Sequence, residues 1–343
     1  MKKLLNTVYV NSPDRYLSLD GENLVISQEG TEIGRVPLHN IERIMTFGHA
    51  GASPALMGKC VKNGIELVFM SRSGHFIARV EGELKGNVLL RRQQYRIADN
   101  EKCSLEVAKN MISAKLFNSR WVLERMIRDH GARIDTYLFG KKSEFLNNSI
   151  KQARNCSDMD SLRGIEGEAA SVYFSVFNDM ILQQKEDFRF DTRNKRPPLD
   201  NVNALLSFAY SMATGMCTSA LESVGLDPYV GFMHTDRPGR RSLALDMVEE
   251  FRSVLCDRFV LTLINKRLVS NDDFVKREDG AVLLTEDGRK NFFSAWQKRK
   301  SEELKHPFLE EKVEWGMLPY VQAMLLARYI RGDLDCYPPF MWK

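Results

Sequence analysis

Hydrophobic and polar positions alternate over short stretches in roughly the first 80 residues, a spacing that is typical of β-strands. Asp20-Gly21 separates two of these stretches and favours a tight hairpin turn. The predicted strands are residues 16–19, 24–27, 32–36, 66–70 and 75–80. A short helix is expected at residues 54–63. The pattern predicts an N-terminal β domain over residues 1–85.

The period changes farther along the chain. Apolar residues recur at intervals of three and four, which indicates an amphipathic helix. They are Leu105, Ala108, Ile112, Leu116, Leu123 and Met126. Asp200 is a plausible N-cap for another helix. Further helices are expected at residues 201–224, 242–265, 286–304 and 312–330, with a small hairpin near 278–280 and an irregular tail at 337–340.

These elements predict an α+β fold, with a small N-terminal β domain followed by a larger, mainly α-helical C-terminal domain. We expect residues 86–100 to be a linker and residues 101–343 to form the helical domain. The six cysteines lie far apart without a Cys-x-x-Cys pair, so they are expected to be buried apolar residues. No apolar run is long enough to span a membrane and no secretion signal is evident, so a cytoplasmic location is expected.

The charge is unevenly distributed. The whole chain has a formal net charge of +4, yet residues 85–128 contain ten basic and four acidic residues, a net of +6. A basic stripe of this kind can neutralise phosphates, although it can also be a solvated helix face. The candidate phosphate contacts are Arg91, Arg92, Lys109, Lys115, Arg120, Arg240 and Arg241.

Four residues could form a metal-dependent active centre. Asp246 and Glu249 are three apart on a predicted helix, so both carboxylates lie on one face. His234 precedes that helix in a basic loop, and Glu166 lies between Gly164 and Gly167 at an expected helix start. Carboxylates with one imidazole suit Mg²⁺ or Mn²⁺, the ions used in phosphodiester chemistry. Each signal alone also fits an ordinary surface carboxylate or a structural histidine.

Taken together, four segments in order resemble the CRISPR-associated integrase family, CRISPR-associated protein one. They are residues 164–174 (GIEGEAASVYF), 196–210 (RPPLDNVNALLSFAY), 225–234 (GLDPYVGFMH) and 242–252 (SLALDMVEEFR). The β domain ahead of them also fits, so the resemblance spans nearly the whole chain. Within these segments, Asn203 and Tyr210 could either anchor helices to one another or contact DNA.

The resemblance implies a homodimer joined through the β domains, with a metal site in each helical domain. The family's metal ligands fall on Glu166, His234 and Glu249, and its supporting acid falls on Asp246. It further implies double-stranded DNA as substrate, both the incoming segment and the CRISPR repeat, and a complex with CRISPR-associated protein two. The implied reaction is spacer insertion by attack of a 3′-hydroxyl on a repeat-boundary phosphodiester, in antiviral defence.

Three alternatives share some of these features. A non-catalytic DNA-binding scaffold would have no use for buried carboxylates near DNA. A junction-resolving metal nuclease would have the same ligands and would cleave branched DNA without joining it. A metallohydrolase acting on small phosphates would not need the long basic stripe.

Overall fold

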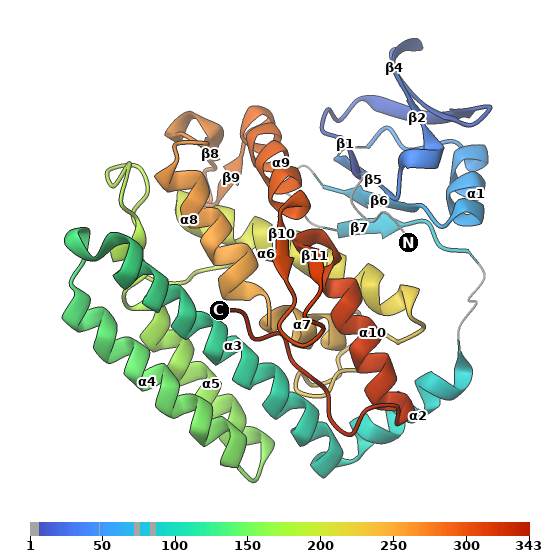
Figure 1. The fold of residues 1–343 in the computed structure, drawn as a ribbon. Helices are drawn as coiled ribbons and strands as arrows, with labels where there is room; N and C mark the ends of the chain where they lie inside the picture. Colours follow the sequence, from blue (N-terminus) through green and yellow to red (C-terminus); the bar gives the residue numbers. More distant parts are fainter. Residues whose placement is uncertain (1–6, 48, 72–75, 83–86) are drawn as a thin grey trace.

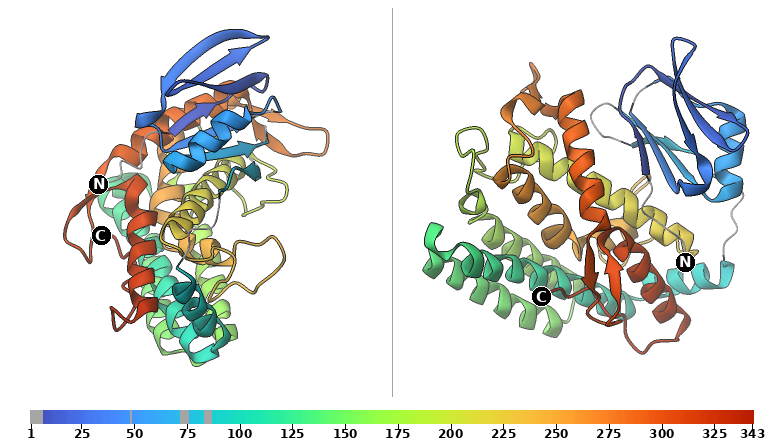
Figure 2. Two further views of the ribbon diagram at one scale, coloured as in Figure 1. Left: turned by 90° about the vertical axis from the view of Figure 1, so that its right-hand side faces the viewer. Right: turned by 45° about the horizontal axis from the view of Figure 1, so that its top comes forward.

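A computed structural model of the chain describes residues 7–47, 49–71, 76–82 and 87–343. The N-terminal strands lie at one corner of the molecule, and helices α3, α4 and α5 lie at the opposite side (Figures 1 and 2). The predicted α+β fold is therefore confirmed, with strands first and a mainly helical remainder.

The N-terminal part contains two sheets and one helix. The four-stranded sheet has the order β1-β5-β6-β7, in which only β7 is antiparallel to its neighbour. Its strands are β1 (Thr7–Val10), β5 (Arg43–Phe47), β6 (Glu66–Met70) and β7 (Phe76–Arg79). The three-stranded antiparallel sheet contains β2 (Arg15–Asp20), β3 (Asn23–Gln28) and β4 (Thr31–Pro37). Helix α1 is Pro54–Asn63, the predicted range.

The predicted hairpin is formed by β2 and β3. Asp20 pairs with Asn23, and Gly21 between them has a φ of +57°, a left-handed conformation that favours glycine. The turn residue identified from the sequence therefore fixes the register of the strands. This register places Leu17 and Leu24 in a fully buried position inside the N-terminal part.

The four-stranded sheet also closes the core of the helical part. Met45, Phe47, Val68 and Met70 belong to the large hydrophobic cluster formed mainly by the helices. The ring centroid of Phe47 lies 4.8 Å from that of Phe293, a residue of α9. The two parts of the chain thus share a continuous apolar interface, although the sequence pattern predicted them as separate domains.

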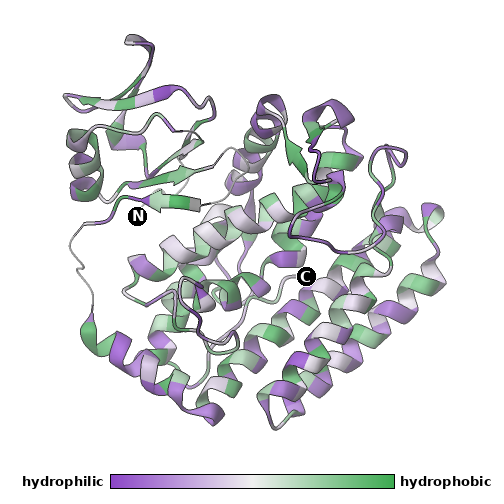
Figure 3. Cartoon of the chain, turned by 180° about the vertical axis from the view of Figure 1, so that it is seen from behind, coloured by the Kyte–Doolittle hydropathy of each residue, from purple (hydrophilic) through white to green (hydrophobic). Residues whose placement is uncertain are grey.

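The helical part contains the remaining elements. Its helices are α2 (Val88–Asp99), α3 (Glu101–His130), α4 (Thr136–Asn155), α5 (Met159–Phe174), α6 (Asn201–Ser223), α7 (Ser242–Glu249), α8 (Arg258–Asn265), α9 (Glu286–Ser301) and α10 (Leu318–Arg331). Two small hairpins are formed by β8 (Phe274–Lys276) with β9 (Val282–Leu284) and by β10 (Glu303–Lys305) with β11 (Lys312–Glu314). Green and purple residues alternate along the outer helices, as expected for amphipathic elements (Figure 3).

Most of the segment expected to be a linker, residues 86–100, forms helix α2. The Asn87 side chain caps α2 by accepting hydrogen bonds from the backbone N–H groups of Leu89 and Leu90. Gln94 is fully buried and binds the backbone of the segment after α6. These contacts stabilise a helix where the sequence shows a short, charged connection.

Two predicted helices are interrupted or shortened. The helix expected at 242–265 is broken after Glu249 by a π-helical segment, Arg252–Asp257, and its N-cap is Arg241. The helix expected at 312–330 begins only at Leu318, because residues Lys312–Glu314 form β11. A three-residue strand is too short to produce a recognisable alternation.

Helix α6 is apolar and long enough to cross a membrane by length and composition, but 72% of its most apolar window is buried inside the protein. Asp200 caps it, as predicted, by accepting a hydrogen bond from the backbone N–H of Asn203. The burial of α6 is that of a central core helix.

The irregular tail after α10 is buried against the turn that ends α7. Glu250 accepts hydrogen bonds from the hydroxyl of Tyr337 at 2.6 Å and from the backbone N–H of Phe340 at 2.7 Å. Gln322 of α10 donates a third hydrogen bond at 3.0 Å. Glu250 is therefore a structural residue that holds the tail, and it does not compete with Glu249 for the site described next.

Candidate active site

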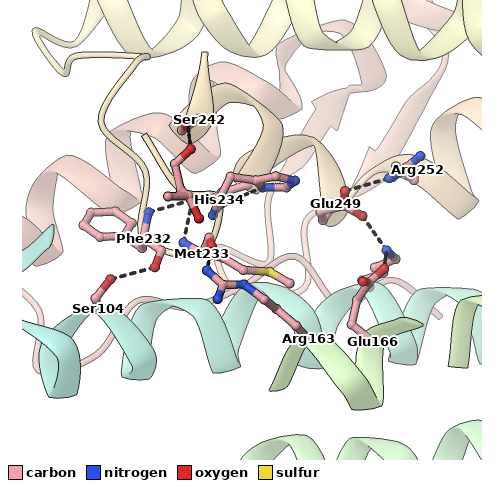
Figure 4. Close-up of polar contacts among 12 residues, drawn as sticks. Ser104, Arg163, Glu166, Phe232, Met233, His234, Ser242, Glu249 and Arg252 are labelled. Carbon is pink, nitrogen blue, oxygen red and sulfur yellow. Dashed lines mark hydrogen bonds and ion pairs between the residues drawn. The ribbon is translucent and has the colours of Figure 1, made fainter. Parts of the chain in front are cut away.

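Two carboxylates and one ammonium group meet where α3, α5 and α7 approach one another (Figure 4). Lys115 of α3 forms ion pairs with Glu166 of α5 and with Glu249 of α7, the latter at 2.7 Å between Nζ and Oε2. Glu166 lies in the middle of α5, whereas the sequence had suggested a position at a helix start. The Glu166 and Glu249 carboxylates thus converge on one cation.

Glu249 is held from both sides. Its other oxygen, Oε1, accepts a hydrogen bond from Nη1 of Arg252 at 2.7 Å, and its side chain is only 6% exposed. Burial alone would raise the pKa of Glu249, but the charges of Arg252 and Lys115 outweigh it and lower the pKa to about 2. Glu249 is therefore an ionised carboxylate across the physiological pH range.

His234 lies in the loop between α6 and α7, and Asp246 fixes its position. One oxygen of Asp246 is 2.5 Å from Nδ1 of His234 and also accepts the backbone N–H of the same residue at 3.0 Å. The other oxygen accepts the N–H groups of Phe232 and Met233 at 2.7 and 3.0 Å. Asp246 is 1% exposed. Because water does not reach the carboxylate, these hydrogen-bond donors stabilise it instead. This leaves Nε2 as the ring nitrogen available to a ligand.

Two of these helices, α3 and α5, also hold the loop carbonyls. Ser104 of α3 donates to the carbonyl of Phe232, and Arg163 of α5 donates to that of Met233, both at 2.7 Å (Figure 4). Gly231 allows the close approach, because a Cβ there would lie 2.7 Å from an oxygen of Asp246. The loop is thereby fixed to the elements that contribute Lys115, Glu166 and Glu249.

The sequence predicted one pocket in which three ligands, Glu166, His234 and Glu249, hold a metal beside the supporting acid Asp246, and the structure instead has two adjoining groups. One group is Glu166–Lys115–Glu249, and the other is Asp246–His234. Among the described residues, no three or more acidic, histidine or cysteine side chains come close enough to hold a metal ion together. His234 nevertheless contributes to the lowered pKa of Glu249, so the two groups are neighbours.

The residues fit a hard divalent cation at the position of the Lys115 ammonium. Two carboxylates already face a positive charge there, and carboxylate oxygens are the donors that Mg²⁺ and Mn²⁺ prefer. Glu166 and Glu249 would hold such an ion, and His234 lies in the adjoining group.

An open pocket of about 550 Å³ adjoins the carboxylates. Lys115 and Glu166 lie in its wall, together with three further cationic side chains. These are Arg193, Lys195 and Arg252. Burial and the nearby guanidinium groups of Arg252 and Arg193 lower the pKa of Lys195. Counting Lys115, four basic residues line the pocket with the acidic Glu166, Asp191 and Asp257, which leaves an excess of one positive charge that favours binding of phosphate.

In the wall of the same pocket, a second polar cluster holds Arg252. The hydroxyl of Tyr210 donates to Asp257 at 2.5 Å, and the Arg252 guanidinium carbon lies 4.4 Å from the Tyr210 ring centroid. Burial raises the pKa of Asp257 to about 6. Tyr210 thus anchors elements to one another, one of the two roles that the sequence had left open. The other residue considered with it, Asn203, is fully buried and binds Arg193 and the adjacent backbone.

The predicted phosphate contacts occupy different environments. Arg92 is exposed, whereas Lys109 pairs with Glu106 at 2.9 Å. Arg91 donates to the carbonyl of Gly225, and Arg120 binds side chains of α4. Arg240 and Arg241 are half-buried in the loop that follows His234. Lys115 is only 9% exposed and lies between the carboxylates of Glu166 and Glu249.

The sequence analysis missed Arg252 as a residue of the site. Its spacing of three residues from Glu249 was the available signal.

The fold and site define an α+β protein with paired carboxylates and a fixed histidine loop beside a basic pocket, an arrangement suited to acting on phosphodiesters. The family model described as "CRISPR associated protein Cas1" matches residues 8–298. The chain therefore belongs to the CRISPR-associated Cas1 family, and the resemblance found in the sequence is confirmed.

Related proteins match along their full length. The chain is 51% identical over 347 residues to "CRISPR-associated endonuclease Cas1 2" of Rhodospirillum rubrum, and 48% identical over 343 residues to "CRISPR-associated endonuclease Cas1 1" of Chlorobaculum tepidum. In both cases the match covers 100% of each chain.

Solved structures share the fold. A casposase bound to its integration product has a TM-score of 0.85 at 20% identity, with 98% of this chain and 94% of that chain covered. A Cas1 protein from Thermotoga maritima has a TM-score of 0.80 at 22% identity, with 97% and 99% covered.

Proposed function

We propose that this protein is a metal-dependent DNA endonuclease and integrase that inserts short foreign DNA segments into a CRISPR array. The observation that carries the proposal is the convergence of Glu166 and Glu249 on one cation beside a basic pocket. The relatives at 51% and 48% identity are named Cas1 endonucleases, and the similar casposase is described with an integration product. The reaction belongs in the cytoplasm, where the array DNA of a prokaryote lies.

The proposed reaction is a transesterification. A 3′-hydroxyl of the incoming strand attacks a phosphorus at the repeat boundary, a new P–O bond forms, and the bond to the repeat's 3′-oxygen breaks. One phosphodiester replaces another, so no nucleotide cofactor is consumed. When bound, Mg²⁺ or Mn²⁺ would lower the pKa of the attacking hydroxyl and neutralise charge on the departing oxygen.

The chain's own residues have distinct roles in this reaction. Glu166 and Glu249 hold the cation, and Arg252 keeps the Glu249 carboxylate oriented and ionised. Asp246 fixes Nδ1 of His234, so Nε2 can contact the ion or carry the proton that the attacking hydroxyl loses. The side chains of Arg193 and Lys195 bind phosphates in the pocket.

The proposal includes two protein partners. We infer a homodimer joined through the N-terminal sheets and an assembly with CRISPR-associated protein two. A structure titled "Cas6-RT-Cas1--Cas2 complex" contains a chain similar to this one, with a TM-score of 0.81 at 19% identity. This chain covers 36% of that longer chain, so the likeness supports the fold of the shared part.

The test is a strand-joining assay with Glu166→Ala and His234→Ala. Purified protein, its small partner, a duplex with free 3′-hydroxyls, a repeat-containing plasmid and Mg²⁺ or Mn²⁺ are combined. We expect both variants to lose joining while they retain folding and DNA binding. Glu168→Ala is the matched control, because Glu168 is exposed on the same helix two residues from Glu166.

The outcomes separate the alternatives. Joined product at the parent level in both alanine variants would defeat the proposal. Hydrolysis of branched DNA by the parent, without any joining, would favour the junction-resolving nuclease. DNA binding with no metal-dependent cleavage or joining in the parent would favour the scaffold.

A further inference from the structure

Lys115 is an unusual residue in the candidate site because it is a cation buried at the position proposed for a metal ion. Its side chain is 11% exposed, and its Nζ contacts Oε1 of Glu166 and Oε2 of Glu249. These are the two carboxylates that would bind the ion. Without a positive charge between them, the buried Glu249 and the partly exposed Glu166 carboxylates would repel each other.

An ammonium and a divalent cation cannot occupy this position together. Both would lie within contact distance of the same two oxygens, and like charges at such separations repel strongly in a buried site. Ion binding therefore requires that the Lys115 ammonium leave the carboxylates. The lysine stem is long and has several rotatable bonds, which permits this movement.

The adjoining pocket is where the displaced ammonium would go. Lys115 itself lines this pocket of about 550 Å³, so a change of rotamer brings Nζ into it. The pocket already contains the cationic side chains of Arg193, Lys195 and Arg252. Asp191 and Asp257 also line the pocket and balance these three cations only in part, so a fourth cation there would be stabilised by the negative charge of a nucleic-acid phosphate.

We propose that Lys115 is an internal competitor of the catalytic metal ion, and that a nucleic-acid phosphate in the pocket helps to move its ammonium away from Glu166 and Glu249. This inference rests on the proposed function. It makes Lys115 a positioning residue that couples two binding events. Because coupling of binding free energies is reciprocal, DNA raises the affinity for the ion as much as the ion raises the affinity for DNA.

The test measures Mn²⁺ binding directly, by electron paramagnetic resonance of free Mn²⁺ during a titration of the full-length protein. Lys115→Met removes the competing charge at similar side-chain length, and we expect it to bind Mn²⁺ about tenfold more tightly, within the usual range of coupling between sites. Lys115→Arg keeps a buried cation and is expected to bind Mn²⁺ no more tightly than the parent.

The coupling to DNA is measured in the same titration with and without a phosphorothioate oligonucleotide, which resists cleavage. We expect the oligonucleotide to tighten Mn²⁺ binding by the parent and to have a smaller effect on Lys115→Met. Lys102→Met is the matched control, since Lys102 is exposed on α3 and its loss changes the net charge equally. Circular dichroism checks that each variant is folded.

Distinct results would overturn the inference or the proposed function. If Mn²⁺ binds the parent through Glu166, shown by its loss in Glu166→Gln, and Lys115→Met binds no more tightly, the inference alone is wrong. Equal tightening by Lys115→Arg and Lys115→Met would also overturn it. If neither the parent nor any variant binds Mn²⁺, the proposed metal dependence is wrong as well.

Discussion

At the scale of single residues, Asp246 determines how the histidine is presented. Its two oxygens accept three backbone N–H groups and contact Nδ1 of His234. The sequence indicated that Asp246 lies one turn from Glu249, and the structure confirms this spacing. The backbone hydrogen bonds were not predictable, because they depend on the path of a loop without regular structure.

We predict that Asp246→Ala lowers both stability and activity. Three N–H groups would lose their acceptor, and an unsatisfied buried donor costs about 1–3 kcal/mol. His234 would lose its orienting partner, for which a decrease in strand joining of about 10- to 100-fold is expected. Thermal unfolding and the joining assay measure the two effects. Asp236→Ala, at an exposed position in the same loop, is the control and should change neither quantity.

At the scale of elements, the sequence predicted helices with clear periodicity and missed those defined by distant contacts. The range of α6 was predicted to within one residue because Asp200 caps it and its apolar residues are continuous. The break between α7 and α8 was missed, since hydrophobic residues continue through the π-helical segment Arg252–Asp257. The individual ligands were predicted through the family resemblance. The contacts of Lys115 and Arg252 with the carboxylates were not predicted, because they depend on how α3, α5 and the turn after α7 pack together.

The loop from Gly225 to Arg241 is an element whose fit to α7 can be tested at Gly231. A Cβ at this position would lie 2.7 Å from an oxygen of Asp246 and 2.9 Å from the backbone carbon of Ser242. We predict that Gly231→Ala displaces the histidine loop and destabilises the protein by about 1–3 kcal/mol, as other overpacked sites do.

The measurement is the melting temperature together with strand joining at saturating metal. Gly140→Ala on α4 is the matched control, because a Cβ there meets nothing within 4 Å. A Gly231→Ala variant with parental stability and joining would show that the loop tolerates the extra carbon, and the close fit would then have no functional consequence.

At the scale of the whole molecule, a buried lysine lies at the junction between the N-terminal sheet and the helices. Lys300 of α9 is 3% exposed, and its Nζ is 3.1 Å from the hydroxyl of Thr7 on β1. Burial lowers the pKa of Lys300 to about 7, with a further contribution from Arg43 that Glu42 and Glu66 partly offset. In the unfolded chain a lysine has a pKa near 10.4, its usual value.

We predict that the free energy of unfolding rises between pH 7 and pH 9 through this residue. In that range the unfolded chain binds more protons at Lys300 than the folded protein does, so raising the pH favours the folded state by up to about 1.4 kcal/mol per unit. Lys300→Met removes the titrating group and should be more stable than the parent at pH 7. This advantage should shrink as the pH rises. Parallel melting-temperature profiles for the two proteins would contradict the prediction.

The buried tail gives the far end of the chain an influence on catalysis. Glu250 accepts hydrogen bonds from Tyr337 and Phe340, and it directly follows Glu249, the residue that pairs with Lys115 and that we propose as an ion ligand. A truncation before Tyr337 would remove two of the three hydrogen-bond donors of the buried Glu250 carboxylate. We expect the backbone turn at Glu250 to move toward solvent as a result, and to displace the adjacent Glu249. The last few residues thus help to position Glu249 in the candidate site, although they contribute no atom to that site.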